Sequence, residues 1–155
     1  MKRIIILIGF LVLNINCKAQ NNTIISGEIT INGHGVFGND VTLLVQYFGQ
    51  PNSIEDYYYE MRELTAKKYI YNGILFYIVN ERFDSFEITG SSHTFTVHNV
   101  KVGESIEKLQ SIYPLSYANK SNGGLMLPLE DMDLFIVISF NTTNNLIKKI
   151  ALYSY

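Results

Sequence analysis

The expected fold follows from Gly38-Asn39-Asp40-Val41-Thr42-Leu43-Leu44-Val45-Gln46-Tyr47, a stretch that recurs 65 residues later as Gly103-Glu104-Ser105-Ile106-Glu107-Lys108-Leu109-Gln110-Ser111-Ile112. The aligned positions share glycine or apolar character: Gly38 with Gly103, Val41 with Ile106, and Leu44 with Leu109. Each stretch soon reaches a proline, Pro51 or Pro114. Such internal similarity predicts two copies of one structural unit.

The first copy begins with the pattern of a short amphipathic helix. Its apolar side chains fall at i, i+3, i+4 and i+7 and form one helical stripe: Val41, Leu44, Val45 and Phe48. Asn39 or Asp40 can cap the N-terminus of this helix. Gly49 is well placed to end the helix, and Pro51 keeps it from resuming.

The second copy carries a thinner stripe made of Ile106, Leu109 and Tyr113. Ser105 is the expected cap of this helix, and Pro114 is its expected stop. Helices of this length are not stable alone, so each copy must provide a sheet on which its helix packs.

The expected strands are rich in β-branched and aromatic residues. In the first copy they cover residues 57–61, 69–79, 83–89 and 92–97, with Asn72-Gly73 as a tight hairpin turn. In the second copy they cover 134–140 and 146–155, separated by the polar turn at 141–145. Residues 26–32 alternate and predict an extra N-terminal strand, whereas 134–138 are apolar on both faces, as in a strand covered on both sides.

These elements predict an α+β fold, in which two tandem copies of a short helix pack on an antiparallel β-sheet. Joining the two copies into one continuous sheet would let them share a core, since isolated copies of about 55 residues would be marginal. The expected organisation is a signal peptide at 1–19, a spacer and strand at 20–37, the first repeat at 38–99 and the second at 100–155.

The ending Phe48-Gly49-Gln50-Pro51 after a short helix, followed by an antiparallel sheet, resembles the repeat of the β-lactamase-inhibitor-protein-like fold. Small outer-membrane lipoproteins of the SmpA/OmlA type share a similar unit, and the chain also looks like exported proteins of the Bacteroidetes type. The second copy departs from the pattern, because Ile112-Tyr113-Pro114 lacks the glycine before the proline. The resemblance implies an exported binding protein without catalysis, and it transfers no functional residue.

The N-terminus has the pattern of an export signal. Met1-Lys2-Arg3 precedes an apolar run at residues 4–12, which is too short to span a bilayer. Cleavage after Cys17-Lys18-Ala19 would release a soluble chain beginning at Gln20. The alternative is a lipid anchor on Cys17, although Asn14 and Asn16 stand where lipoprotein signals usually carry Leu and a small residue. The protein is therefore expected in the periplasm or outside the cell, or else on the outer membrane.

The composition excludes several classes of partner. The formal net charge of the whole chain is −2, and removal of residues 1–19 would take away Lys2, Arg3 and Lys18. An acidic mature chain disfavours nucleic acid and anionic membrane surfaces, which require clustered cations. Cys17 is the single cysteine, so the mature domain has no disulfide and no cysteine ligand for zinc.

Candidates for catalysis or metal binding are sparse. His93 and His98 stand five apart on an expected strand, hence on opposite faces, and His34 lies in an expected turn. The acidic run at 130–133 lacks the spacing of a calcium loop and is interpreted as a solvated turn. Neither a nucleophile elbow nor a phosphate-binding loop occurs. We therefore expect no cofactor, no metal and no enzymatic activity.

Tyrosine is the most informative excess, with 11 residues in the chain. Five fall in the expected first sheet and form the candidate interaction surface: Tyr57, Tyr59, Tyr69, Tyr71 and Tyr77. If helices cover one face, alternation leaves part of this set on the other face, where it suits protein recognition. The leading hypothesis is an exported non-catalytic module that binds a protein or envelope component. The alternatives are a structural lipoprotein of the outer membrane and a hydrolase or small-ligand binder.

Overall fold

The computed structural model describes residues 23–96 and 98–153 of the chain. The expected signal peptide, its cleavage site and Cys17 lie outside these residues. The main element is one seven-stranded sheet with the order β3-β4-β5-β6-β9-β8-β7, in which every neighbouring pair is antiparallel. Its strands are β3 (Ser53–Tyr59), β4 (Leu64–Tyr71), β5 (Ile74–Val79), β6 (Arg82–Ile88), β7 (Gly124–Pro128), β8 (Phe135–Phe140) and β9 (Ile147–Tyr153).

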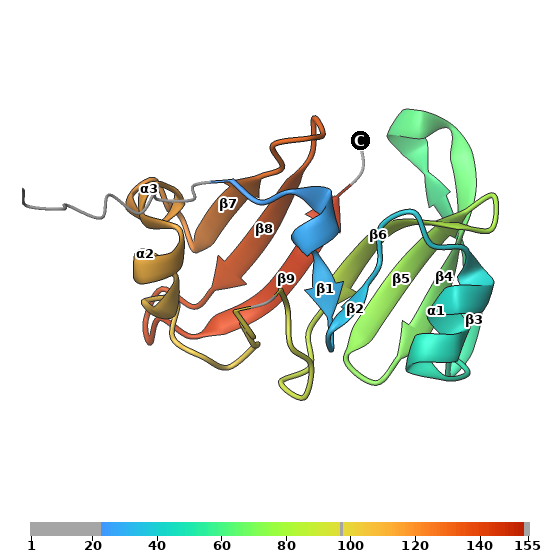
Figure 1. Cartoon of the computed structure of the whole chain (residues 1–155), viewed down its shortest axis with the longest axis horizontal. Helices are drawn as coiled ribbons and strands as arrows, with labels where there is room; N and C mark the ends of the chain where they lie inside the picture. Colours follow the sequence, from blue (N-terminus) through green and yellow to red (C-terminus); the bar gives the residue numbers. More distant parts are fainter. Residues whose placement is uncertain (1–22, 97, 154–155) are drawn as a thin grey trace, which may run out of the picture.

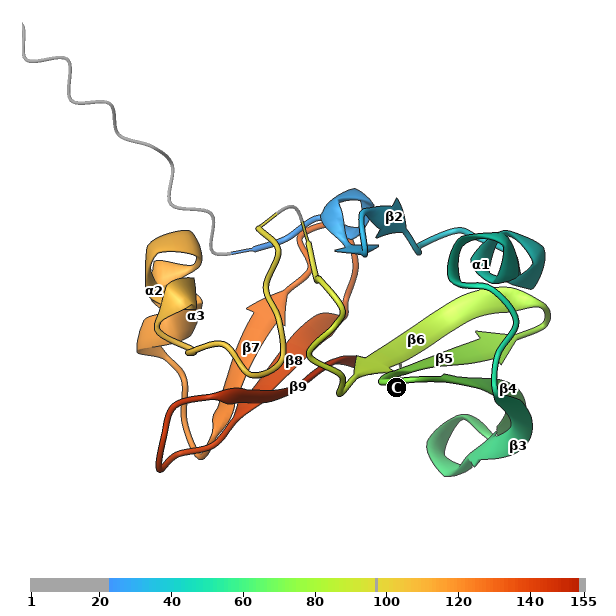
Figure 2. The same ribbon diagram turned by 90° about the horizontal axis from the view of Figure 1, so that it is seen from below.

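The helices and the N-terminal segment lie on one side of this sheet (Figures 1 and 2). They are α1 (Val41–Phe48), α2 (Lys108–Ile112) and α3 (Pro114–Ala118), together with the 3-10 turn η1 (Ser26–Glu28) and the small hairpin of β1 (Thr30–Ile31) and β2 (His34–Gly35). Within the described residues, no α-helix covers the other side. The α+β class and the antiparallel sheet are therefore confirmed.

The first expected helix is confirmed to the residue. The Asp40 carboxylate accepts a hydrogen bond of 2.9 Å from the Leu43 amide, as an N-terminal cap does. Gly49 ends α1 with a φ of +79°, and its N–H donates to the Val45 carbonyl over 2.9 Å. Glycine adopts a positive φ without steric cost. The end of α1 at Gly49 could therefore be predicted from the sequence.

The second helical segment differs from the prediction. Pro114 does end α2, but it also occupies the first turn of a new helix, α3, since its fixed φ suits that position. Ser105 does not cap α2. Its hydroxyl accepts from the Glu107 amide over 3.2 Å, and α2 begins only at Lys108.

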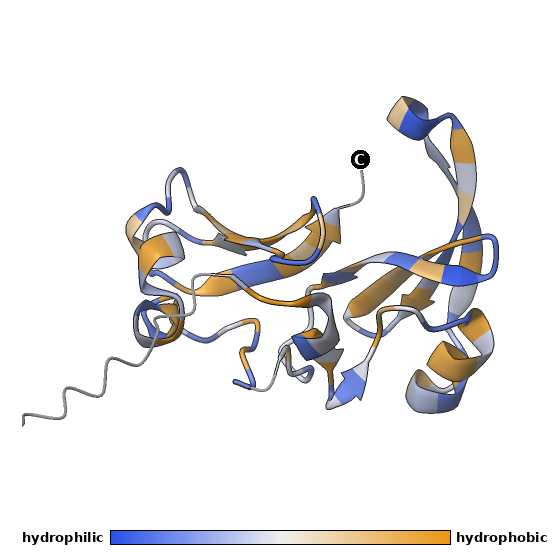
Figure 3. Ribbon diagram, turned by 45° about the horizontal axis from the view of Figure 1, so that its top comes forward, coloured by the Kyte–Doolittle hydropathy of each residue, from blue (hydrophilic) through white to orange (hydrophobic). Residues whose placement is uncertain are grey.

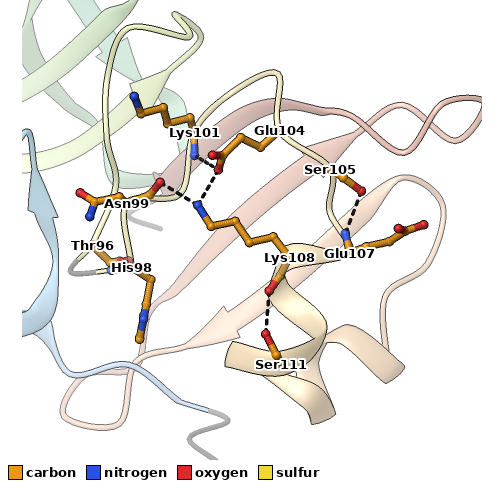
Figure 4. A network of polar contacts seen from close by, with 9 residues as sticks. All are labelled: Thr96, His98, Asn99, Lys101, Glu104, Ser105, Glu107, Lys108 and Ser111. Carbon is orange, nitrogen blue, oxygen red and sulfur yellow. Dashed lines mark hydrogen bonds and ion pairs between the residues drawn. The ribbon is translucent and has the colours of Figure 1, made fainter.

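The approach to α2 is held by a polar network (Figure 4). The Lys108 ammonium donates to the Glu104 carboxylate over 2.9 Å and to the Asn99 carbonyl over 3.0 Å. The same carboxylate accepts from the Lys101 amide over 3.0 Å. These bonds connect the loop before α2 to the helix itself. The charged groups of Glu104 and Lys108 thus stabilise the local fold.

One expected strand is shortened to two residues, and in another the described residues form no ladder. In the segment 26–32, η1 occupies the first residues and only Thr30–Ile31 pair, because the Asn32-Gly33 turn folds the chain back onto β2. In 92–97, Phe95 makes isolated bridges to Ile31 and Val100 rather than a ladder. Phe95 is fully buried. Its inward-facing aromatic ring explains why the segment resembled a strand.

The core lies between the sheet and the helices. Strand β8 shows why: Ile136, Ile138 and Phe140 are buried, whereas the alternate residues are only partly covered. The prediction that this strand is covered on both sides is therefore wrong, since only one face is fully buried. In the hydropathy colouring β5 is largely hydrophobic, whereas the turns between strands are largely hydrophilic (Figure 3).

The two halves meet edge to edge within the sheet. Strand β6 pairs with β9 through Phe86 with Leu152 and Ile88 with Ile150. One half contributes four strands and one α-helix, whereas the other contributes three strands and two α-helices. The sheet is thus continuous, while the interpretation of the halves as tandem copies stays a prediction.

Candidate binding face on the open side of the sheet

Cross-strand partners share a face of the sheet, so the register defines which side chains point away from the helices. One row of partners crosses the first half as Lys68, Tyr77 and Ser85. A second row crosses the whole sheet through Leu75, Glu87, Ala151, Val137 and Met126. We call this side the open face, because the helices lie on the other side (Figure 2).

Three of the five predicted tyrosines form one cluster on the open face. The ring centroids of Tyr57 and Tyr59 are 5.0 Å apart, and those of Tyr57 and Tyr77 are also 5.0 Å apart. Both pairs meet edge to face, the arrangement that the quadrupoles of aromatic rings favour. Burial raises the pKa of the Tyr59 hydroxyl and that of the Tyr77 hydroxyl well above the ordinary value, so both stay protonated near neutral pH.

Tyr69 and Tyr71 do not belong to this cluster. Tyr69 pairs with Phe76 and Tyr71 with Ile74, so both lie on the face that packs against the helices. Tyr71 contacts Phe48 of α1 with a centroid distance of 6.3 Å and donates to the Gly49 carbonyl over 3.2 Å. The predicted set is therefore divided between the two faces of the sheet.

A β-bulge in β6 completes the cluster. Tyr77 pairs with Ser85 and Ile78 with Phe83, which leaves Asp84 as the extra residue. Asp84 and Ser85 consequently both reach Tyr59, whose hydroxyl lies 2.9 Å from the Ser85 hydroxyl and donates to the Asp84 carboxylate over 3.2 Å. The Arg62 guanidinium pairs with Asp84 at 2.8 Å and lies 5.2 Å from the centre of the Tyr59 ring.

A second polar chain runs from the cluster to the last strand. The Tyr77 hydroxyl donates to Glu87 over 3.3 Å, and the Lys149 ammonium lies 3.3 Å from the other oxygen of the same carboxylate. Lys149 also donates to the Tyr153 hydroxyl over 2.6 Å. Residues of both halves thus fix the side chains of the open face.

The end of the β3–β4 hairpin arches toward the C-terminal end of β9 (Figure 1). A half-open pocket of about 540 Å³ lies at this place. We call it the arch pocket. Its walls come from β3, from the 3-10 turn η2 (Glu60–Arg62) and from the last strand: Tyr57, Tyr58, Tyr59, Glu60, Met61, Arg62 and Tyr153. The volume is within the range of ligand and side-chain pockets, roughly 300–1,000 Å³.

Sequence reasoning missed five of these residues, namely Tyr58, Glu60, Met61, Arg62 and Tyr153. The segment 57–62 carried a usable signal, since a run of tyrosines next to Met and Arg matches the composition of interface centres. Tyr153 had none, because its place beside η2 depends on the long-range pairing of β9 with β6.

The three histidines occupy structural positions. His34 stacks on Tyr47 at 4.3 Å, His93 bonds to Asn32 and to the Asn72 carbonyl, and His98 meets the Tyr113 ring edge to face at 5.9 Å. His93 and His98 are not on a common strand, which corrects the predicted spacing argument. Among residues 23–96 and 98–153, no group of three or more His, Cys, Asp or Glu residues could hold a metal ion.

The acidic run fastens the N-terminal segment. Asp131 accepts a hydrogen bond of 2.9 Å from the Ser26 amide and a second from the Ser26 hydroxyl, and Glu130 accepts from Thr23 over 3.2 Å. The bonds from Ser26 lower the pKa of the Asp131 carboxyl. The carboxylates are thus used to hold residues 23–26 against the second half.

Comparison with known proteins gives structural matches only. No protein-family model matches the chain, and no curated protein matches it. A cysteine-rich secretory protein from Staphylococcus aureus subsp. aureus Mu50 is similar with a TM-score of 0.54 and 12% identity, over 87% of this chain and 48% of that one. An extracellular protein containing an SCP domain from Bacillus anthracis str. Ames is similar with a TM-score of 0.52 and 14% identity, over 77% of this chain and 44% of that one.

At these identities the similarity shows the fold alone, and this chain spans about half the length of both proteins. A "putative beta-lactamase inhibitor protein" from Streptococcus mutans aligns over 83% of this chain and 93% of that one with 16% identity, at a TM-score of 0.34. A score this low carries no argument, so the resemblance to that fold stays a prediction. No helix of the described residues is long and apolar enough to cross a membrane.

Proposed function

We propose that this protein is an exported, non-catalytic module that binds another protein through the open face of its sheet. The observation that carries the proposal is the arch pocket, an aromatic pocket in which hydrogen bonds and an ion pair hold Tyr59, Arg62 and Tyr153. Export is supported by the N-terminal pattern of residues 1–19. Two solved structures of similar fold are described as an extracellular protein and a secretory protein, which agrees with that pattern.

The residue types around the arch pocket favour a protein partner. Met61 is 84% exposed, Tyr58 57% and Tyr57 40%, all within one hairpin end. Tyr, Met and Arg are enriched at the centres of protein interfaces, and exposed large apolar side chains that gather in one place mark such sites. Tyrosine also loses little conformational entropy on binding, because it has only two side-chain torsions.

Three ion pairs compensate charges of the open face, whereas Glu60 in the lining of the arch pocket belongs to none of them. Asp84 pairs with Arg62 at 2.8 Å, Glu87 with Lys149 at 3.3 Å and Glu55 with Lys68 at 3.7 Å. A face of this kind selects its partner by shape and apolar contact rather than by net charge. Binding should therefore depend only weakly on salt concentration between about 50 and 200 mM.

Site-specific crosslinking tests the proposal. A photoreactive amino acid placed at Met61 in the native host should crosslink one envelope protein, whereas the same group at Gln110 on α2, an exposed position on the helical side, should not. The crosslinked partner, once purified, should bind the Tyr57→Ala, Met61→Ala double variant at least ten times more weakly than the parent. The variant Gln110→Ala is the control and should bind like the parent.

Two results would overturn this function. Equal crosslinking from Met61 and Gln110 would show that the open face is not selective. Unchanged affinity of the double variant would show that the arch pocket is not the binding site. A hydrolase or a small-ligand binder then becomes the better hypothesis. The absence of enzymatic activity is part of the proposed function.

An outer-membrane lipoprotein with a role in assembly is the alternative that depends on Cys17. The mass of the purified N-terminal peptide distinguishes this lipoprotein from a soluble exported chain, because a chain that begins at Gln20 has no lipidated cysteine. Binding through the open face is compatible with either form, so this measurement decides the location without deciding the function.

We also propose that the two halves are related copies of one unit. The sheet order supports this, since β4-β5-β6 and β7-β8-β9 are three-stranded meanders that meet through their last strands. The extra strand β3 and the division of the second helix at Pro114 would then be later differences between the copies.

A further inference from the structure

A second pocket lies on the helical side of the sheet, away from the arch pocket. Its volume is about 340 Å³. It forms where four connections meet: the β1–β2 turn, the C-terminal end of α1 with the link to β3, the β4–β5 turn and the loop that carries His93. The first three of these connections lie along the same edge of the molecule in Figure 1. We call it the amide pocket, for the side chains described below.

Close backbone packing brings two of these connections together. A Cβ atom on Gly73 would lie 2.6 Å from the Gly90 Cα, so only glycine allows the β4–β5 turn to approach the loop after β6 this closely. The approach places the His93 ring against the turn, where Nε2 donates to the Asn72 carbonyl over 2.7 Å.

The ring-bearing walls of the amide pocket are held in fixed positions. His34 stacks on Tyr47 at a centroid distance of 4.3 Å and an interplanar angle of 12°, and because His34 is not itself a lining residue it supports the ring from outside the pocket. The Tyr71 hydroxyl donates to the Gly49 carbonyl. His93 Nδ1 lies 3.1 Å from Nδ2 of the Asn32 side chain, while Oδ1 of the same side chain accepts from the Thr94 N–H over 3.0 Å.

The amide side chains at the rim have the opposite character. Gln50, Asn52 and Asn72 are exposed and line the pocket, and none of the three side chains makes a hydrogen bond within the described residues. Each side-chain amide offers two donor hydrogens and one acceptor oxygen. Together they provide an adaptable set of donors and acceptors around an aromatic wall.

The charge of the pocket restricts its ligand. Among the described residues that line it, no side chain is an acid, a lysine or an arginine. A phosphate, carboxylate or ammonium group would therefore meet no opposite charge in the lining that could compensate its own. Hydroxyl groups, in contrast, both donate to and accept from amides, and the aliphatic face of a sugar ring packs on an aromatic face.

We propose that the amide pocket binds a neutral saccharide. Its volume is at the small end of the range for ligand sites, roughly 300–1,000 Å³, which fits one or two sugar rings. Tyr47 and Tyr71 provide the ring contacts, and the amides of Gln50, Asn52 and Asn72 bond to the hydroxyl groups. The protein would then bind a glycan on one side of its sheet and a protein on the other, and neither site depends on the other.

The test is a titration of the ¹⁵N-labelled protein with glucose, N-acetylglucosamine, cellobiose and N,N′-diacetylchitobiose. Binding of at least one of these sugars should shift the side-chain amide resonances of Gln50, Asn52 and Asn72. The variants Gln50→Ala and Asn52→Ala should each weaken that binding at least ten-fold. Gln46→Ala, an exposed glutamine on α1 that does not line the pocket, is the matched control and should bind like the parent.

Three outcomes would overturn the inference: no binding of any of the four sugars, equal binding by the pocket variants, or tighter binding of N-acetylneuraminic acid or glucose 6-phosphate. The Tyr57→Ala, Met61→Ala variant separates the two proposals. It should bind the sugar normally, so loss of protein binding and loss of sugar binding are independent results.

Discussion

The hydroxyl oxygen of Tyr59 lies 2.9 Å from that of Ser85, and an extra residue in β6 makes this contact possible. Without the bulge at Asp84, a single side chain of β6 would face Tyr59 at this point, whereas the bulge presents two. Ser85 is almost completely buried, at 3% exposure, so Tyr59 is the partner that satisfies a hydroxyl group with little access to water.

Replacement of Tyr59 by Phe should therefore destabilise the protein. The variant keeps the ring contacts but leaves the buried Ser85 hydroxyl without this partner, which costs about 1–3 kcal/mol. Urea denaturation measures the change in the free energy of unfolding. Tyr58→Phe, at a mostly exposed residue of the same strand, should change it by less than about 0.5 kcal/mol. Equal effects of the two variants would contradict the role of the contact.

Replacement of Gly73 by Ala should cost more than replacement of Gly33. Both glycines have a φ near +80°, so each alanine pays about 1 kcal/mol for the left-handed backbone. Only the Cβ at position 73 would meet backbone, the Gly90 Cα at 2.6 Å, whereas position 33 has free space. We expect Gly73→Ala to exceed Gly33→Ala by about 1–3 kcal/mol in chemical denaturation. Similar losses in the two variants would show that the loops separate without cost.

The division of the tyrosines between two faces could have been predicted from the sequence. A two-residue turn at Asn72-Gly73 fixes the register, so Tyr71 must pair with Ile74 and Tyr69 with Phe76. The register alone therefore places Tyr77 on the opposite face from Tyr69 and Tyr71. It does not say which face is the core, because residues 74–79 are bulky and apolar at both alternate sets of positions.

Other parts of the site could not be predicted in this way. The bulge at Asp84 leaves no mark in the alternation of 83–89, because Ser and Asp are compatible with either face. The dual role of Pro114 was underdetermined, since proline both ends helices and favours their first turn. The amide pocket depends on four connections that are distant in sequence, and single asparagine and glutamine residues in turns are too common to indicate a site.

Stability should decline in alkaline solution partly because of Tyr113. Burial raises the pKa of this hydroxyl from 10.0 to about 12, with the nearby Glu28 carboxylate raising it further and the hydrogen bond from Thr96 opposing the shift. The unfolded chain therefore loses this proton at a lower pH than the folded chain. The contribution is complete below pH 10 and is lost as the pH rises toward 12, about 3 kcal/mol in all.

Thermal unfolding between pH 9 and pH 12 measures this decline. Tyr113→Phe should show a shallower decline than the parent, because the variant has no hydroxyl to ionise at this position. Tyr117→Phe on the adjacent helix α3 is the control and should follow the parent. A parallel decline of parent and Tyr113→Phe would contradict the assignment.

Neither half of the protein should fold alone. The outer edge of β6 pairs with β9, and the residues at this junction are core residues: Phe86 with Leu152 and Ile88 with Ile150, all at 1% exposure or less. A chain of residues 20–99 would expose these side chains and leave the β6 edge unpaired, which invites aggregation. It would also lose Leu129, whose bridge with Ile24 fastens the N-terminal segment to the second half.

We expect residues 20–99 to lack a cooperative thermal transition by circular dichroism, and residues 100–155 likewise. Mixing the two fragments should restore part of the transition, because the β6–β9 junction then re-forms; a soluble first fragment that melts cooperatively alone would show that the sheet consists of two independent domains.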